Sequence, residues 1–149
     1  MTERVLNILR RHGKNISCVF TGKLLETLSD EQLVEILNQI KEIGSIRKSI
    51  AIFDHQLKPE EYGNYIKQGI TPMIVPSDED IHIALEGMDA VFTQQPDILC
   101  LGITDEVLLP MIASARESTE ILLISSTKQA IENCLIYADY LILIENIKK

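Results

Sequence analysis

The sequence contains no tryptophan, and aromatic residues make up only 5% of its 149 positions. We therefore expect no surface on which successive nucleic-acid bases stack against aromatic rings. Long hydrophobic runs are also missing, since the longest, Tyr140 to Ile144, is far too short to cross a bilayer. Residues 1–4 (MTER) open no long apolar stretch, so the sequence predicts neither a signal peptide nor a membrane protein.

Cysteine is scarce and scattered. Cys18, Cys100 and Cys134 each lie within an apolar run, and no two of them have the CxxC spacing of a zinc site. An odd number of widely spaced cysteines also argues against a disulfide framework. We expect three buried thiols in a reducing compartment, the cytoplasm.

Positive charge is in deficit. Lys and Arg number 14 and Asp and Glu 22, which gives a formal net charge of −8. An acidic chain repels phosphate backbones at long range, so RNA is a possible partner only through a local basic patch or a bridging metal ion. The candidates for such a patch are Arg47, Lys48 and Arg116.

Short β-type runs alternate with helical patterns along the chain. This alternation predicts an α/β fold with three α/β/α layers and a mostly parallel sheet of five or six strands, PIN-like or Rossmann-like. We expect a single domain over 1–149, with a core at about 15–145 behind a short amphipathic helix at 1–13. The expected strands are 16–20, 49–53, 73–75, 97–101, 121–124 and 140–144.

The expected helices lie between these strands. Ser29 and Gln32 form a capping box before apolar residues at helical spacing, and Pro59 starts the next helix. Later helices are expected to open at Ser77, at Thr104 or Asp105, and at 127. The helix that opens at Ser77 has one apolar face, formed by Ile81, Ala84, Leu85, Met88, Val91 and Phe92.

Polar residues follow the strands, and ligands bind such sheets at the carboxyl ends of the strands. Carboxylates gathered at successive strand ends could hold a hard cation such as Mg²⁺, although acids at helix starts also stabilise the helix dipole. On an ideal helix Glu79 points away from the apolar face, so we expect it to be solvated. The residues that follow the first five strands are Thr21-Gly22-Lys23, Asp54-His55, Ser77 to Asp80, Thr104-Asp105-Glu106, and Ser125-Ser126-Thr127.

Nucleotide-binding signatures are missing. The chain has no GxGxxG, and Gly22-Lys23 is followed by Leu24 rather than by the Ser or Thr of a phosphate-binding loop. No nucleotide cofactor is therefore expected. Ser125 and Ser126 could still offer hydroxyls and amides to an anion.

Two stretches carry a resemblance to a known family. Residues 75–89 (VPSDEDIHIALEGMD) and 101–110 (LGITDEVLLP) resemble the NYN domain family, a branch of the PIN-like nuclease fold, and above all its compact archaeal members. The resemblance runs from about Asn15 to Glu145 and includes the closing Ala138-Asp139-Tyr140. It implies an acidic site in which Mg²⁺ or Mn²⁺ activates water to cut RNA.

The chain departs from that family at its site. The family motif D-G-x-N reads Thr21-Gly22-Lys23-Leu24 here, which removes one acid and the amide. Asp80 matches the acid at the start of the long helix. In the motif [ST]-x-D-x-D-F-x-P, Asp105 matches the first acid, but Val107 replaces the second and Leu108 replaces Phe.

The resemblance thus implies a site in which Asp80 and Asp105 would be catalytic and would hold a weakly bound Mg²⁺ or Mn²⁺, because each lost carboxylate weakens the site's hold on the ion. Asp78 or Glu106 could substitute for the missing ligands. The expected substrate contacts are Thr21, Gly22, Thr104, Ser125 and Ser126.

Three functions stay open. The first is a domain descended from ribonucleases with weak or no activity, acting as an RNA- or protein-binding module. The second is an active metal-dependent endoribonuclease with a rebuilt site that could include Asp54. The third is a flavodoxin-like small-molecule or signalling domain. Receiver domains of this type need a Lys after a late strand, but here Ser125-Ser126 follow the fifth strand and Lys128 lies further on. A homodimer is also possible through Tyr62, Tyr65 and Ile66, although core packing explains these residues better.

Overall fold

A computed structural model describes residues 13–147, so the helix expected at 1–13 lies almost wholly outside the described residues. Six strands form one sheet in the order β3-β2-β1-β4-β5-β6, and every neighbouring pair is parallel. The expected α/β/α fold is confirmed. The strands are β1 (Asn15–Thr21), β2 (Ser45–Phe53), β3 (Thr71–Ile74), β4 (Ile98–Gly102), β5 (Glu120–Ser125) and β6 (Tyr140–Leu143).

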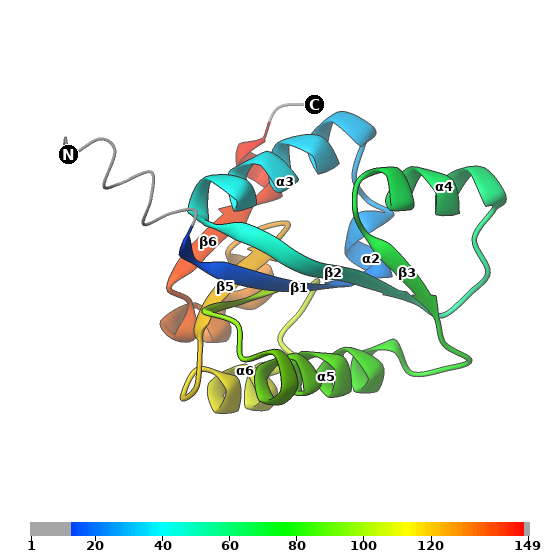
Figure 1. Cartoon of the computed structure of the whole chain (residues 1–149). Helices are drawn as coiled ribbons and strands as arrows, with labels where there is room; N and C mark the ends of the chain where they lie inside the picture. Colours follow the sequence, from blue (N-terminus) through cyan, green and yellow to red (C-terminus); the bar gives the residue numbers. More distant parts are fainter. Residues whose placement is uncertain (1–12, 148–149) are drawn as a thin grey trace.

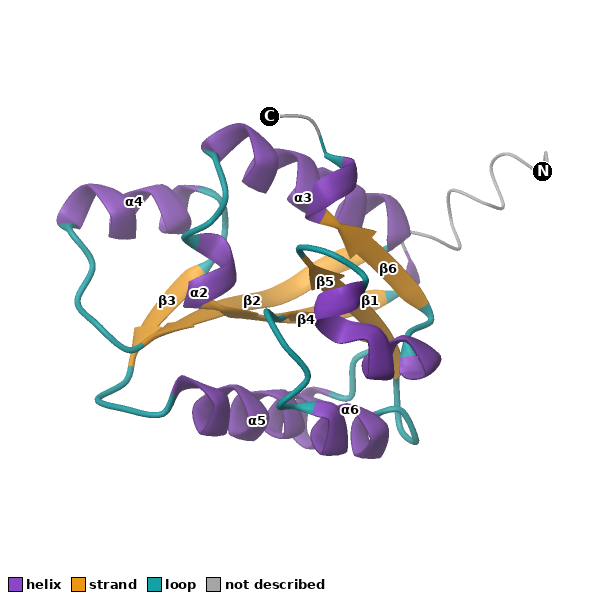
Figure 2. Ribbon diagram, turned by 180° about the vertical axis from the view of Figure 1, so that it is seen from behind, coloured by secondary structure: helices purple, strands orange, loops and turns teal. Residues whose placement is uncertain are grey.

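The chain winds outward from the centre of the sheet twice, first toward β3 and then toward β6. Helices that follow β1 and β2 cover one face of the sheet, and helices that follow β3 and β4 cover the other (Figures 1 and 2). The first group is α2 (Gly22–Leu25), α3 (Asp30–Ile43) and α4 (Pro59–Lys67), and the second is α5 (Glu79–Asp89) and α6 (Leu109–Ala115). The winding direction reverses between β1 and β4, and at such a switch point α/β sheets bind their ligands.

Both faces of the central strands are buried, which explains their continuous apolar runs. In β1, Cys18 and Phe20 pack under α3, whereas Val19 belongs to the cluster under α5 and α6. The paired strand β4 divides in the same way, with Cys100 on the first face and Leu101 on the second. Among residues 13–147, no helix is both long enough and apolar enough to span a membrane.

Two helices start where the sequence predicts. Ser29 Oγ accepts from the Gln32 amide at 3.1 Å, and Gln32 Oε1 accepts from the Ser29 amide at 3.0 Å, so the capping box of α3 is complete. Pro59 is the first residue of α4. Tyr65 packs on Phe53 with ring centroids 5.4 Å apart, as core packing predicts, whereas Tyr62 and Ile66 are exposed.

Two other predicted helices differ from the structure: one begins later than expected, and the other is not an α-helix. Residues 104–108 form bends and turns, and α6 begins only at Leu109. The helix expected at 127–135 is a 3-10 segment, η2 (Gln129–Tyr137), that is kinked at Ile131, where φ is −131°. A short 3-10 turn, η3 (Ile144–Asn146), follows β6.

The start of α5 also differs from the prediction. Its N-cap residue is Asp78 rather than Ser77, and Asp78 has left-handed backbone angles, with φ 53° and ψ 67°. Asp tolerates this conformation better than most residues. The helix then buries Ile83 and Gly87 against the sheet.

Part of the apolar face that the sequence predicts also packs on the core, since Ala84 and Met88 are partly buried against it. Val91 lies in the core, within the π-helical turn η1 (Ala90–Gln94) that continues α5. However, Ile81, Leu85 and Phe92 are 55%, 61% and 70% exposed. The helix therefore has two apolar faces, and only one of them packs on the sheet.

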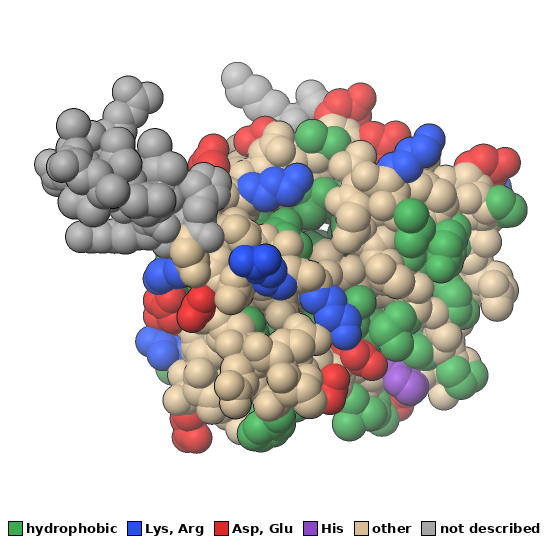
Figure 3. Space-filling model, viewed as in Figure 1, with side chains coloured by type: hydrophobic (Ala, Val, Ile, Leu, Met, Phe, Trp, Pro, Cys, Tyr) green, Lys and Arg blue, Asp and Glu red, His purple; other side chains and the backbone are tan. Residues whose placement is uncertain are grey.

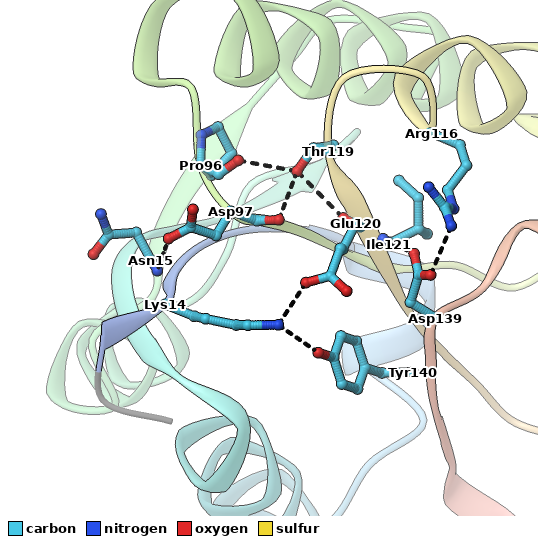
Figure 4. Close-up of polar contacts among 10 residues, drawn as sticks. All are labelled: Lys14, Asn15, Pro96, Asp97, Arg116, Thr119, Glu120, Ile121, Asp139 and Tyr140. Atoms are coloured by element: carbon cyan, nitrogen blue, oxygen red, sulfur yellow. Dashed lines mark hydrogen bonds and ion pairs between the residues drawn. The ribbon is translucent and has the colours of Figure 1, made fainter. Parts of the chain in front are cut away.

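Polar contacts join neighbouring segments at the edge of the sheet where the strands begin (Figure 4). Lys14 Nζ lies 2.8 Å from Glu120 Oε1 and donates to the Tyr140 hydroxyl at 3.0 Å. These two hydrogen bonds raise the pKa of Lys14 above its usual range. The Asn15 amide donates to Asp97 Oδ2 at 2.8 Å, which joins β1 to the start of β4.

Asp139 completes this edge. Its Oδ1 lies 2.9 Å from Arg116 Nη2, and its Oδ2 accepts from the Ile121 amide at 2.9 Å (Figure 4). The closing Ala138-Asp139-Tyr140 motif therefore supplies structural contacts, at the edge opposite to the switch point.

Candidate functional site

The switch point is the place where β1 and β4 end side by side, with Phe20 paired to Gly102. Two glycines make this arrangement possible. A Cβ on Gly22 would lie 2.4 Å from Phe53 Cδ1, and a Cβ on Gly102 would lie 2.4 Å from Phe20 Cδ1. Gly22, predicted to contact substrate, is buried and is required here for packing.

A buried carboxylate lies beside the end of β1. Glu79, the first residue of α5, is only 4% exposed and accepts a hydrogen bond from the hydroxyl of Thr21, itself 3% exposed. Glu79 Oε1 also lies 3.4 Å from the Lys23 amide, which donates to it. A buried carboxylate is costly unless it is hydrogen-bonded, and its place at a helix N-terminus is favourable for negative charge.

The expectation that Glu79 is solvated is therefore wrong. Glu79 shares the buried face with Ile83 and Gly87, at intervals of four residues. The acid that faces Thr21 is thus Glu79 and not its neighbour Asp80, which is half-buried. Asp78 is exposed.

The two acids after β4, Asp105 and Glu106, have different hydrogen-bond partners. Asp105 is exposed, and its Oδ1 accepts from the Val107 amide at 3.0 Å. The Glu106 carboxylate accepts from the backbone amide of Asn133 and, at 3.3 Å, from its side-chain amide. The kink at Ile131 frees that backbone amide, so Glu106 caps the second part of η2.

The charges of these two acids also affect the pKa of the Cys134 thiol. Burial raises its pKa, and the negative charges of Glu106 and Asp105 raise it further. Glu106 therefore bonds to η2 and Asp105 bonds within its own loop, whereas Glu79 bonds to Thr21 at the end of β1.

Metal ligation by these acids stays a prediction. Within the part of the chain that the structure describes, no three His, Cys, Asp or Glu side chains are grouped so that they could hold a metal ion. The carboxylates of Glu79, Asp105 and Glu106 each already accept hydrogen bonds from the protein.

The predicted substrate-binding hydroxyls differ in their accessibility. Ser125 is fully buried, and its Oγ donates to the Ile103 carbonyl at 2.7 Å, which joins β5 to the residue after β4. Thr21 is buried against Glu79. Ser126 is exposed and Thr104 is half-buried, so among the predicted substrate-binding hydroxyls these two are accessible.

A second feature of this edge is a histidine between two carboxylates. His55 Nδ1 lies 2.9 Å from Asp54 Oδ1, and His55 Nε2 lies 2.8 Å from Glu26 Oε1. The hydrogen bond with Asp54 is the main cause that raises the pKa of His55, and the same bond lowers the pKa of Asp54. Asp54-His55 directly after a strand is the sequence signal for this contact, but Glu26 is not predictable from it.

His55 is one of the residues that line a hollow of about 490 Å³ between α4 and the start of α3. The hollow is mostly polar, and Glu26, Asp30 and Glu61 give it negative charge. Burial raises the pKa of Tyr65 in its wall, and these three carboxylates raise it further.

The predicted basic patch lies away from these acids. Arg47 Nε donates to Asn15 Oδ1 at 2.8 Å, and Arg116 pairs with Asp139, both near the edge where the strands begin. Figure 3 shows Lys and Arg side chains in a band over α3 and β2. At the switch point itself, the buried carboxylate of Glu79 lies against Thr21.

Comparisons with known proteins bear on the fold alone. No family model and no curated protein matches the chain. Among solved structures, the chain is similar to a protein of unknown function, VPA0982 from Vibrio parahaemolyticus, with 12% identity and a TM-score of 0.70. The match covers 89% of this chain and 94% of that chain, so the two share their fold over nearly their whole length.

Proposed function

We propose that this chain is a NYN/PIN-like domain whose metal site has degenerated, so that it has little or no nuclease activity and works as a binding module for a protein. It would work as one domain in the cytoplasm. The free and buried cysteines support a reducing compartment.

The contact between Thr21 and Glu79 carries this proposal. In the family that the sequence resembles, an acid stands where this chain has Thr21, and it would share a divalent ion with the acid at the start of the long helix. Here a hydroxyl donates to Glu79 at the start of that helix instead, and the Lys23 amide donates to the same carboxylate. A divalent ion would have to displace donors that already satisfy the buried carboxylate.

The charge distribution favours a protein over RNA as the partner. The carboxyl edge carries Asp54, Asp78, Asp80 and Asp105 against Lys23 and Lys128, so it is acidic on balance, whereas Arg47 and Arg116 lie near the opposite edge. An acidic edge without a bound cation repels phosphate. A protein with a basic contact face would be attracted to it, and that attraction would weaken with salt.

The test is to put the missing acid back. Thr21→Asp places two carboxylates side by side, so the variant should unfold at a lower temperature in EDTA than the wild type. Mn²⁺ should then raise its melting temperature in a saturable way. Thr21→Asn is the matched control, because it has the same shape without the charge and should not respond to Mn²⁺.

Wild-type protein should also show no saturable response to Mn²⁺ or Mg²⁺. A response that Glu79→Gln abolishes would mean that the metal site works, and it would overturn the proposal even if Thr21→Asp failed to fold. Tight binding of wild-type protein to single-stranded RNA, measured by fluorescence anisotropy, would refute the choice of a protein partner.

A further inference from the structure

The outer face of α5 and η1 carries a row of apolar side chains that no element within residues 13–147 covers. Ile81, Leu85 and Phe92 are each more than half exposed, and Met88 between them is half-buried. Figure 3 shows hydrophobic side chains at the surface on the side of the molecule formed by α5. Positions 81, 85, 88 and 92 follow the heptad spacing of a seam along which one helix packs against another. We call this row the α5 stripe.

The fold holds the α5 stripe outward. The opposite face of the helix, with Ile83 and Gly87, packs on the sheet. The π-helical turn η1 carries Phe92, and Ser17 Oγ donates to Gln94 Oε1 at 2.7 Å, which ties the end of this turn to β1. Such π-helical turns are rare and occur mostly at functional sites. The stripe therefore has a fixed place on the surface and no use in the core.

The border of the α5 stripe is acidic. Residues 79–94 contain no Lys or Arg, whereas three acids with access to solvent, Asp80, Glu86 and Asp89, lie on this segment. On a helix, Asp89 and Glu86 follow one side of the stripe and Asp80 the other. Lys48 of β2 and Glu86 line the same small hollow, so negative charge prevails along the border by three acids to one cation.

This charge decides between two kinds of occupant. A second copy of the chain, paired through the same face, would bring its own acids against those of the first, and like charges in contact are unfavourable. A segment with an apolar face bordered by Lys or Arg would instead match both the stripe and its border. The complementary occupant is therefore basic and comes from another protein.

We propose that the α5 stripe is the docking site for an amphipathic basic helix of a protein partner. The inference rests on the proposed function, in which the chain binds a protein with a basic contact face, and it adds the surface and the form of the partner segment. The apolar residues of that helix would cover Ile81, Leu85 and Phe92, while its Lys or Arg residues meet Glu86 and Asp89.

The dimensions of the surface suit such a helix. From Ile81 to Phe92 the α5 stripe spans about 17 Å, which is about three helical turns. At the Phe92 end, a hollow of about 330 Å³ leaves room for a side chain of the partner. The hollow is lined by Val91, Phe92, Gln95, Pro96 and Ser118.

The missing tryptophan makes binding at this surface directly measurable. Phe92→Trp in the full chain places a single tryptophan on the α5 stripe. The probe is a synthetic helical peptide of about 18 residues, with Leu at the seam positions and Lys at the others. Its addition should shift the emission to the blue in a saturable way, and salt should weaken the binding. The same peptide with Glu in place of every Lys should give no saturable shift.

A second substitution tests the place of binding. Leu85→Asp in the Phe92→Trp background should weaken binding of the Lys peptide by about tenfold or more. Leu85 is 61% exposed, so this variant should keep its fold, which circular dichroism checks. The matched control is Ile136→Asp, since Ile136 is 81% exposed on η2 and lies outside the stripe. The control should bind the Lys peptide as tightly as its parent does.

Three results would overturn the inference. They are an absence of binding to Phe92→Trp, equal binding by Leu85→Asp and its control, and a dimer of the peptide-free wild type that sedimentation detects and Leu85→Asp removes. Equal binding would show that the surface is wrong while the chain still binds a basic protein segment. A wild-type response to Mn²⁺ would instead refute the degenerate metal site and would leave peptide binding unchanged, so the two failures are distinguishable.

Discussion

Single residues at the switch point fix how closely the strands and helices approach there. Gly22 lies against Phe53 and the Ile52 carbonyl, and a Cβ would come within 2.4 and 2.8 Å of them. Gly22→Ala should therefore lower the free energy of unfolding by about 3 kcal/mol. A Cβ added to Gly63, within α4, would meet no atom within 4 Å, so Gly63→Ala should instead stabilise the protein by about 0.5–1 kcal/mol. Urea unfolding of both variants checks the pair, and equal effects would contradict this packing.

The hydrogen bond between Thr21 and Glu79 should be visible in stability. Thr21→Val keeps the shape but removes the donor to a buried carboxylate, so unfolding should become easier by about 1.5–3 kcal/mol. Thr93→Val is the control, because Thr93 is exposed and donates to a carbonyl of its own helix; it should change stability by less than about 0.5 kcal/mol. Chemical denaturation measures both, and a neutral Thr21→Val would show that Glu79 does not need this donor.

The contacts of His55 give stability a defined pH dependence. The pKa of His55 is raised from 6.5, so its contribution is complete below pH 6.5 and is lost as the pH rises through the folded-state pKa. The pKa of Asp54 is lowered from 3.8, so its contribution is present above pH 3.8 and is lost as the pH falls through the folded-state value.

The melting temperature of wild-type protein should therefore exceed that of His55→Gln most clearly between pH 3.8 and 6.5. The advantage should shrink toward pH 9. A difference that stays constant across this range would mean that the paired charges contribute nothing to stability.

At the scale of elements, α5 shows why part of the site is not predictable from the sequence. Its sequence has apolar residues on two faces, and helical periodicity alone cannot decide which face the sheet buries. The sheet takes the face of Ile83 and Gly87, and Glu79 goes with it. Periodicity therefore assigns the carboxylate at the switch point to solvent, and the resemblance selects its neighbour Asp80.

The loop after β4 is the second element, and its two acids have separate structural roles. Asp105→Asn should be nearly neutral or stabilising, because Asn keeps an oxygen for the Val107 amide and removes a charge from an acidic edge. Glu106→Ala should cost about 1 kcal/mol, since the cap of η2 is lost. Thermal unfolding of the two variants checks this, and a severe loss with Asp105→Asn would point to a structural partner for Asp105.

At the scale of the whole molecule, the alternation of strands and helices is sufficient to predict the parallel α/β/α fold. Burial on both faces gives continuous apolar strands, and parallel strands need crossover helices. Contacts between distant segments are not predictable in this way, because they arise only from packing. Glu106 with Asn133 and His55 with Glu26 are examples.

The most direct measurement of the central claim is cleavage of single-stranded RNA by the wild-type chain in Mg²⁺ or Mn²⁺, with EDTA as the reference. Our account predicts the same slow background in both conditions, and no change with Asp105→Asn or Glu79→Gln. Robust cleavage that needs the metal ion and is lost in either variant would contradict it.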